Sequence, residues 1–192
     1  MKLKLLAILC GFILTCCFGR EKSGFEIYGD VMQILPFAMM IYSYAKDDIQ
    51  GVKEQATGAG ATLLLTHLIK ESLVIVSHSN EAKVRFAQRP NNGSFNGFPS
   101  GHTSFVFSSV GFAQKHYGYQ LSLPLAALAT SVGISRIHAQ KHTTTQVIAG
   151  AILGFSTSYL FASKYTPPQM SFLIDVTPNG TFYYGVSYKK IF

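Results

Sequence analysis

The chain has 192 residues, enough for one domain of ordinary size and too few for two comfortable ones. Hydrophobic residues make up 48% and charged residues only 13%, about half the ~25% of a typical soluble domain, so the composition excludes disorder. Lysine and arginine outnumber aspartate and glutamate by 16 to 9, a net charge of +7, which favours an anionic partner.

The first nineteen residues are a candidate targeting segment. Lys2 and Lys4 precede an apolar run that ends at Phe18, which is the pattern of a signal sequence or a first membrane span. All three cysteines of the chain lie within this run. The rest of the chain can therefore form neither a disulfide nor a thiolate metal site.

Apolar segments that predict helices follow at regular intervals. They run over Val31–Ala45, Ala59–Val76, Ser104–Ala113, Leu121–Ile134 and Val147–Ala162. Several are shorter than the ~20 residues that cross the hydrocarbon of a bilayer, but flanking Ser, Thr and Tyr can extend them. Small residues such as Gly150 and Gly154 suit close helix packing. The expected fold is all-α, a polytopic membrane bundle of about five to six helices, with a soluble secreted bundle as the alternative.

The pattern changes after Pro167 and Pro168. Two segments, 172–176 and 181–192, flank a Pro-Asn-Gly turn, and Phe182, Tyr184, Val186 and Tyr188 of the second alternate onto one face, which predicts a β-hairpin. The expected regions are a signal sequence or first span over 1–19, a helical-bundle domain over 20–165, and a tail with a short hairpin over 166–192.

Two polar stretches, 77–100 and 136–142, carry most of the reactive side chains. An even number of predicted crossings separates them, so both lie on the same side of the membrane. If the N-terminal lysines stay inside, this side is the outer face. No aspartate or glutamate occurs between Glu81 and Asp175, so a carboxylate-bound metal or a carboxylate pair is not expected in this half.

Three short stretches in these loops suit the chemistry of a phosphate ester. They are Arg89-Pro90, Pro99-Ser100-Gly101-His102, and Ser135-Arg136 followed by His142. Ser100 and Gly101 stand where an apolar helix begins, so backbone N–H groups can meet an anion there. Two arginines can each grip phosphate oxygens with a planar fork of donors. Since no carboxylate is near, one histidine can attack phosphorus and the other can protonate the leaving oxygen.

Together these stretches resemble the type 2 phosphatidic acid phosphatase family, which shares its core with vanadium haloperoxidases and bacterial nonspecific acid phosphatases. The family pattern is Lys-x6-Arg-Pro, then Pro-Ser-Gly-His, then Ser-Arg-x5-His-x3-Asp, and the resemblance covers about residues 59–162. It implies that His142 is the nucleophile that becomes phosphorylated and that His102 is the acid. It implies no metal or other cofactor. The residues that it assigns to phosphate binding are Arg89, Ser100, Gly101 and Arg136.

This sequence departs from the family pattern at two positions. Ala82 stands where the family has its lysine, Lys83 is one residue off, and Lys70 lies on the apolar helix where the family lysine normally resides. An insert after this helix would explain the spacing, so we expect Lys70 to bind phosphate. Gln146 stands where the family has aspartate. We expect its side-chain carbonyl to hold His142, because a nucleophilic imidazole needs an acceptor for its other N–H.

The forms Arg-Pro-Asn-Asn-Gly and Phe-Pro-Ser-Gly-His-Thr are most similar to those of bacterial lipid A phosphatases. The resemblance implies a metal-independent lipid phosphatase of the bacterial inner membrane with its active site facing the periplasm. Its partners would be the membrane and a phosphorylated lipid, and not nucleic acid. Undecaprenyl pyrophosphate and phosphatidylglycerophosphate are alternative substrates, and a secreted acid phosphatase, a haloperoxidase and a non-catalytic lipid-binding protein are alternative functions. We expect His78, His116 and His138 to be exposed loop residues.

Overall fold

The structure is a computed structural model that describes residues 22–167, 169–176, 179 and 182–189. The expected targeting segment, 1–19, lies outside the described residues. The described chain forms six α-helices, two 3-10 helices and two strands. In chain order they are α2 (Gly24–Val31), η1 (Met32–Ile34), α3 (Leu35–Ala45), α4 (Ile49–Ser79), η2 (Glu81–Ala87), α5 (Gly101–His116), α6 (Tyr119–His138), α7 (Thr144–Phe161), β1 (Gln169–Val176) and β2 (Phe182–Lys189). The expectation of an all-α protein is confirmed.

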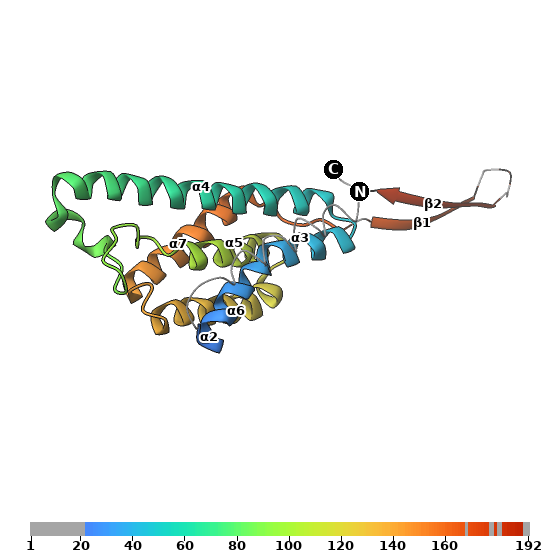
Figure 1. The fold of residues 1–192 in the computed structure, drawn as a ribbon. Helices are drawn as coiled ribbons and strands as arrows, with labels where there is room; N and C mark the ends of the chain where they lie inside the picture. The colour runs from blue at the N-terminus through green and yellow to red at the C-terminus, as the bar shows by residue number, and fades with distance from the viewer. Residues whose placement is uncertain (1–21, 168, 177–178, 180–181, 190–192) are drawn as a thin grey trace, which may run out of the picture.

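Helix α4 forms one edge of the bundle and runs along its whole length (Figure 1). Its 31 residues correspond to about 46 Å. The helix begins at Ile49, well before the apolar segment that starts at Ala59, and its first turns bury the polar side chains of Glu54 and Gln55. Asp48 caps the helix by accepting a hydrogen bond from the N–H of Gly51 at 2.8 Å. A hydropathy pattern alone therefore misses this start.

Helices α5 and α7 cross at very short range in the middle of the bundle (Figure 1). A Cβ atom on Gly154 would lie only 1.9 Å from the carbonyl oxygen of Ser104, and one on Gly150 would lie 2.6 Å from that of Ser100. Only glycine lets the two backbones approach this closely. The small residues of α7 therefore pack as the sequence predicts, and they bring the start of α7 beside the start of α5.

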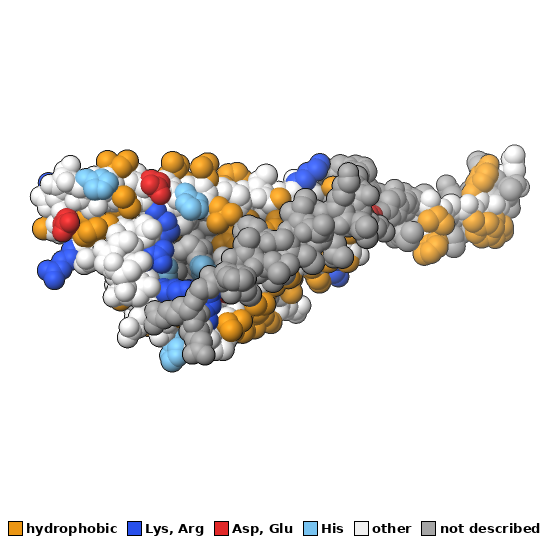
Figure 2. All heavy atoms as spheres, viewed as in Figure 1, with side chains coloured by type: hydrophobic (Ala, Val, Ile, Leu, Met, Phe, Trp, Pro, Cys, Tyr) orange, Lys and Arg blue, Asp and Glu red, His pale blue; other side chains and the backbone are white. Residues whose placement is uncertain are grey.

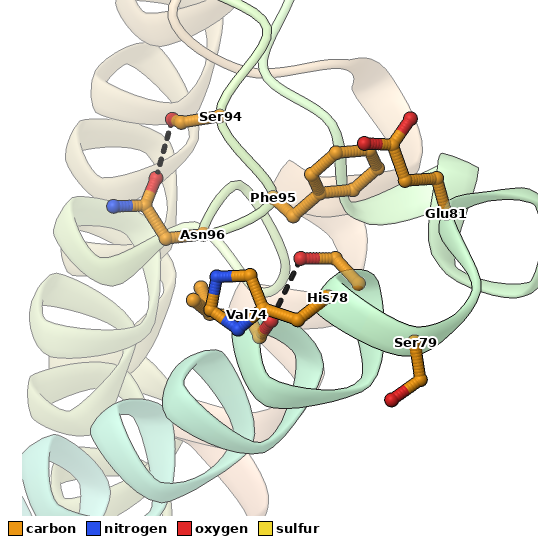
Figure 3. A pocket seen from close by; sticks show the side chains of 8 residues that line it. Val74, His78, Ser79, Glu81, Ser94, Phe95 and Asn96 are labelled. Carbon is orange, nitrogen blue, oxygen red and sulfur yellow. Dashed lines mark hydrogen bonds between the residues drawn. The ribbon is translucent and has the colours of Figure 1, made fainter.

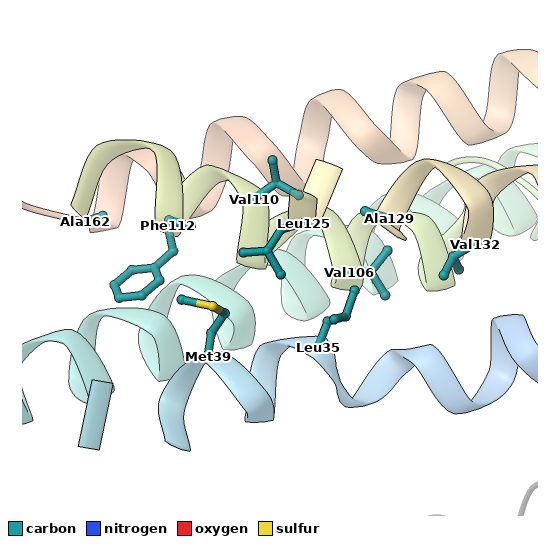
Figure 4. Close-up of a cluster of buried hydrophobic side chains, with 10 residues drawn as sticks. Leu35, Met39, Val106, Val110, Phe112, Leu125, Ala129, Val132 and Ala162 are labelled. Atoms are coloured by element: carbon teal, nitrogen blue, oxygen red, sulfur yellow. The ribbon is translucent and has the colours of Figure 1, made fainter. Parts of the chain in front are cut away.

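The apolar core is small and lies between α3, α5 and α6. Figure 4 shows Leu35 and Met39 of α3 facing Val106 and Val110 of α5 and Leu125 of α6. Many other buried side chains are polar, among them serines and threonines of α4 and α5. The interior of the bundle is therefore held by hydrogen bonds as well as by apolar burial.

The C-terminal hairpin extends beyond the end of the bundle at which α4 begins (Figure 1). Its strands β1 and β2 are antiparallel, with Phe172 opposite Val186. The described strands confirm the predicted hairpin, while most of its expected turn lies outside the described residues. Phe172, Tyr184 and Val186 are exposed.

His116 is buried near the same end, which corrects the expectation of an exposed loop residue. It is the last residue of α5, and its Nε2 lies 2.7 Å from Asp48 Oδ2 while its Nδ1 lies 3.1 Å from Glu54 Oε2. The hydroxyl of Tyr117 also donates to Asp48, at 2.7 Å. Asp48 and Glu54 at the start of α4 thus find their polar partner, His116, at the end of α5 inside the protein. His78 and His138 are exposed as expected, but both lie in helices.

Candidate active site

The two polar stretches that carry the motifs lie together at one end of the bundle. Helices α4 and α6 end there, and α5 and α7 begin there (Figure 1). His142, which precedes α7, places its Nδ1 2.9 Å from the carbonyl oxygen of Gly97 in the other stretch. The structure therefore brings the two motif-bearing stretches together, as the sequence predicts.

His142 is buried and held in one orientation. Its Nδ1 lies 2.9 Å from the Gly97 oxygen and 3.1 Å from Gln146 Oε1, and both partners can only accept a hydrogen bond. Nδ1 therefore carries the hydrogen, and Nε2 keeps a free lone pair. Burial, then the charges of Arg89 and Lys70, lower the pKa of His142 to about 3, so the ring is neutral at ordinary pH.

Gln146 uses both ends of its side chain. Its Oε1 accepts from His142 and from the N–H of Thr143, at 3.2 Å, which completes the capping box of α7. Its Nε2 donates to the carbonyl oxygens of Phe86 at 2.9 Å and Gln88 at 3.0 Å. A carboxylate has no hydrogen to give to these two carbonyls. Glutamine at this position therefore ties the loop that carries His142 to the end of η2 and to Gln88, the residue after it.

Lys70 and Arg89 both donate hydrogen bonds to Asn96. The Lys70 ammonium donates to the backbone oxygen of Asn96 at 2.5 Å, and Arg89 Nε donates to its Oδ1 at 2.6 Å. The Lys70 side chain also passes beside Gly101, at 3.8 Å from the position of a Cβ there. Lys83, in contrast, is exposed on η2. The structure therefore brings Lys70 to the motif residues and leaves Lys83 outside, with η2 as part of the intervening insert.

The start of α5 presents backbone donors to the same space. Ser100 is the buried N-cap residue, its N–H donates to the Gln146 carbonyl at 2.9 Å, and its hydroxyl oxygen accepts from Thr103 at 3.0 Å. The N–H groups of Gly101 and His102 follow in the first turn, where helices lack internal acceptors. These two groups and the Ser100 hydroxyl form an anion-binding end of the helix.

A carboxylate that the sequence reasoning missed lies on the other side of the site. Asp30 of α2 places its Oδ1 3.0 Å from His102 Nε2 and 2.7 Å from Arg136 Nη1. Arg136 is fully buried, and its Nη2 donates to the backbone oxygen of Glu26 at 2.6 Å. Asp30 lies far before the acid-free half of the chain that carries the motifs, so the composition of that half does not indicate it. A Ser-x-x-Glu signature that begins at Ser23 could have predicted α2 itself.

The surface around the site is strongly basic. Figure 2 shows lysine and arginine side chains gathered in a band between α4 and the helices at the opposite edge. Among the described residues, no group of His, Asp and Glu side chains has the arrangement to hold a metal ion. The arrangement can bind a phosphate group through cations and backbone N–H groups, with a neutral imidazole beside it.

A pocket of about 570 Å³ adjoins these cations at the end of α4 (Figure 3). Ser94, Phe95 and Asn96 line one side of it, and His78 and Glu81 line the other. Asn96 belongs both to this pocket and to the hydrogen bonds of Lys70 and Arg89. The pocket therefore lies beside the residue to which Lys70 and Arg89 both donate hydrogen bonds.

The comparisons with known proteins agree with this chemistry. The profile of the PAP2 superfamily matches residues 55–168. The chain is 34% identical over 166 residues to the lipid A 4'-phosphatase of Helicobacter pylori. This aligned region covers 85% of this chain and 83% of that protein. It is 34% identical over 116 residues to the lipid A 1-phosphatase of the same species, covering 60% and 59%, respectively. A bacitracin transport permease protein of Bacillus licheniformis, BcrC, is 39% identical over 79 residues, or 41% of this chain and 37% of that protein. No solved structure matches the chain significantly.

Proposed function

The chain belongs to the PAP2 superfamily and is a phosphoric monoester hydrolase, a lipid phosphatase. From that premise we propose that it removes a phosphate monoester from lipid A and that His142 is phosphorylated as an intermediate. The observation that carries the mechanism is the pairing of His142 Nδ1 with two acceptors, Gly97 and Gln146. This pairing directs the lone pair of Nε2 at the phosphate.

In the first step, His142 Nε2 attacks phosphorus while the bond from phosphorus to the lipid oxygen breaks. His102 gives its proton to that leaving oxygen. Lys70, Arg89 and Arg136, with the Gly101 and His102 N–H groups, stabilise the charge on the three phosphoryl oxygens. In the second step, His102 takes a proton from water, and the resulting hydroxide displaces His142 to release phosphate. The protein's own cations supply the charge stabilisation, so the reaction needs no metal ion.

Lipid A is the substrate that the comparisons favour. The 4'-phosphatase relative is similar over most of both chains, whereas the 1-phosphatase relative covers a smaller share at the same identity. We therefore favour the 4'-phosphate. The pocket at the end of α4 supports a sugar head group, because Ser94, Asn96 and His78 offer hydrogen-bonding groups and Phe95 offers an apolar ring face. Undecaprenyl pyrophosphate and phosphatidylglycerophosphate are the competing substrates.

The bundle is proposed to be embedded in the bacterial inner membrane with the site facing the periplasm. Among the described helices, α4 is the one that passes the length and hydropathy test for a membrane span. Exposed apolar side chains on α4, α6 and α7 suit contact with lipid tails. They include Leu64, Leu68, Ile75, Leu123, Ile134, Ile148, Ile152 and Leu160. In this arrangement residues 20–165 form the phosphatase domain, preceded by a targeting segment over 1–19 and followed by the tail.

The decisive experiment is mass spectrometry of lipid A from cells with the wild-type protein and with His142→Gln. We expect the wild-type protein to remove one phosphate and the variant to remove none. Purified protein should release phosphate from lipid A faster than from the two competing lipids. Phe95→Ala should raise KM for lipid A more than for a small phosphate ester. Equal activity of the His142 variant and the wild-type protein would overturn the mechanism, and faster release from a polyprenyl or glycerol lipid would overturn the substrate.

A further inference from the structure

Helix α2 is fixed to the site by a close approach to α6. A Cβ atom on Gly29 would lie 2.0 Å from the Ser135 hydroxyl and 2.5 Å from Arg136 Nη2. This contact brings the next residue, Asp30, within hydrogen-bond distance of two motif residues from different helices. Its Oδ1 is shared by His102 Nε2 and Arg136 Nη1. Lys22 donates to the other oxygen, Oδ2, at 2.7 Å.

Asp30 is ionised in this environment. Burial raises its pKa, but hydrogen bonds from His102 and Lys22 and the charge of Arg136 outweigh burial and hold the pKa below its usual range. An ionised carboxylate can only accept hydrogen bonds, so His102 Nε2 carries a hydrogen that points at Asp30. Nδ1 is then the nitrogen of His102 that can pass a proton to the substrate.

We propose that Asp30 is a positioning residue for the reaction, holding the Nε2–H of His102 so that Nδ1–H protonates the leaving oxygen. The role rests on the proposed function. When the bond from phosphorus to the leaving oxygen breaks, the proton on Nδ1 moves to that oxygen, and His102 becomes neutral with Nε2–H still bound to Asp30.

The charges around His102 show why a carboxylate is needed. Burial lowers the pKa of His102 below its ordinary value, and the charges of Arg136 from α6 and Lys141 from the loop before α7 lower it further. The hydrogen bond and the charge of Asp30 from α2 act in the opposite direction and favour the protonated ring. Lys141 is itself paired with Glu26 Oε1 at 2.5 Å. Without the negative charge of Asp30, the imidazole would face two cations and would lose its proton at lower pH. An acid that is already deprotonated cannot assist the leaving group.

The test uses two phosphate monoesters that differ in their leaving groups. An alkyl phosphate needs a proton on its departing oxygen, whereas 4-nitrophenyl phosphate releases a stable anion without one. We expect Asp30→Asn to slow the alkyl ester by about 100-fold or more, the scale of general acid catalysis. The aryl ester should change far less, which also shows that the variant folds. The high-pH limb of kcat for the alkyl ester should move to lower pH.

Two further variants complete the test. Glu26→Gln removes the neighbouring carboxylate of α2 and should change both esters by the same factor. In a His102→Gln background, Asp30→Asn should cause no additional loss on the alkyl ester, because both changes remove the same proton transfer. Equal slowing of both esters by Asp30→Asn, or no slowing of either, would overturn the role of Asp30 while leaving the phosphatase function intact. If the wild-type protein hydrolysed neither ester, the proposed function and this role would fall together.

Discussion

His142 Nδ1 lies 3.1 Å from Gln146 Oε1, one helical turn along the chain, and this contact joins the proposed nucleophile to the cap of α7. The same imidazole nitrogen lies 2.9 Å from the Gly97 carbonyl. Two acceptors therefore share one hydrogen, and neither carries a charge. The ring is positioned without a carboxylate, which distinguishes this site from the family pattern that ends in aspartate.

Gln146→Leu should slow the reaction, because it removes one acceptor from His142 and leaves the carbonyls of Phe86 and Gln88 without their donor. The cost should be about 1–3 kcal/mol, or roughly 5- to 150-fold in kcat. Gln146→Glu keeps the size but turns an oxygen toward those two carbonyls, so it should also be slower than the wild-type enzyme despite its added charge. Steady-state rates on 4-nitrophenyl phosphate measure both. A Glu variant faster than the wild type would show that the two donated hydrogen bonds are unimportant.

The neutral state of His142 predicts a specific pH behaviour. In the proposed mechanism His142 can attack only as the neutral ring, which predominates above its folded-state pKa of about 3. The rate should therefore fall only as the pH drops through that value and the ring becomes protonated. Arg89→Gln removes a charge that opposes protonation, so the pKa of His142 should rise. Histidine NMR signals, assigned with His142→Gln, should show a ring that stays neutral between pH 7 and 5 in the wild type. A His142 signal that titrates near 6.5 in the wild-type protein would contradict this prediction.

Lys70→Met should lower kcat/KM by roughly 100- to 1000-fold, the usual effect of removing one donor to the charge of a transition state. Lys83→Met is the matched control, since it removes the same charge from the exposed face of η2 and should change the rate little. Circular dichroism would show whether each variant keeps its helices. A large effect of Lys83 with a small effect of Lys70 would mean that the insert does not have the position described here.

Removal of divalent ions should leave the rate unchanged. In the proposed mechanism the charges that stabilise the phosphate are those of Lys70, Arg89 and Arg136. The two carboxylates of α2, Asp30 and Glu26, are paired with histidine or basic residues. Activity measured before and after dialysis against EDTA tests this directly. Loss of activity that Mg²⁺ or Zn²⁺ restores would refute the metal-independent mechanism.

His116→Ala should destabilise the protein without changing its chemistry. The variant leaves a cavity beside the buried Asp48 and Glu54 and removes the ring that contacts both carboxylates, and a buried polar group that loses its partner costs about 1–3 kcal/mol. Thermal unfolding in detergent should show a clear fall in Tm, with kcat per folded molecule unchanged. His78→Ala changes an exposed histidine and is the control. Equal Tm values for the two variants would show that the buried group contributes nothing.

Local patterns predict much of this protein. The Pro-Ser-Gly-His stretch stands at a helix start, Thr143 caps α7, and the hairpin follows the paired prolines, because caps and turns depend on neighbouring residues. The contact between His102 and Asp30 joins residues 72 positions apart, and no local pattern encodes it. The start of α4 and the burial of His116 were missed for one reason. Polar residues that pair inside a protein have the same hydropathy as exposed ones.

The carboxylate that faces His102 lies on α2, outside residues 55–168, which match the superfamily profile. In the proposed mechanism, a segment that precedes the shared core thus contacts the general acid, His102, while the residues proposed to bind phosphate lie within the core. Sequence variation in a helix that precedes the core can then change how fast a relative cleaves an ester with a poor alkoxide leaving group, although every motif residue is unchanged. A classification of relatives by their motifs alone would place them in one group, even where the helix before the core gives them different preferences among phosphate esters.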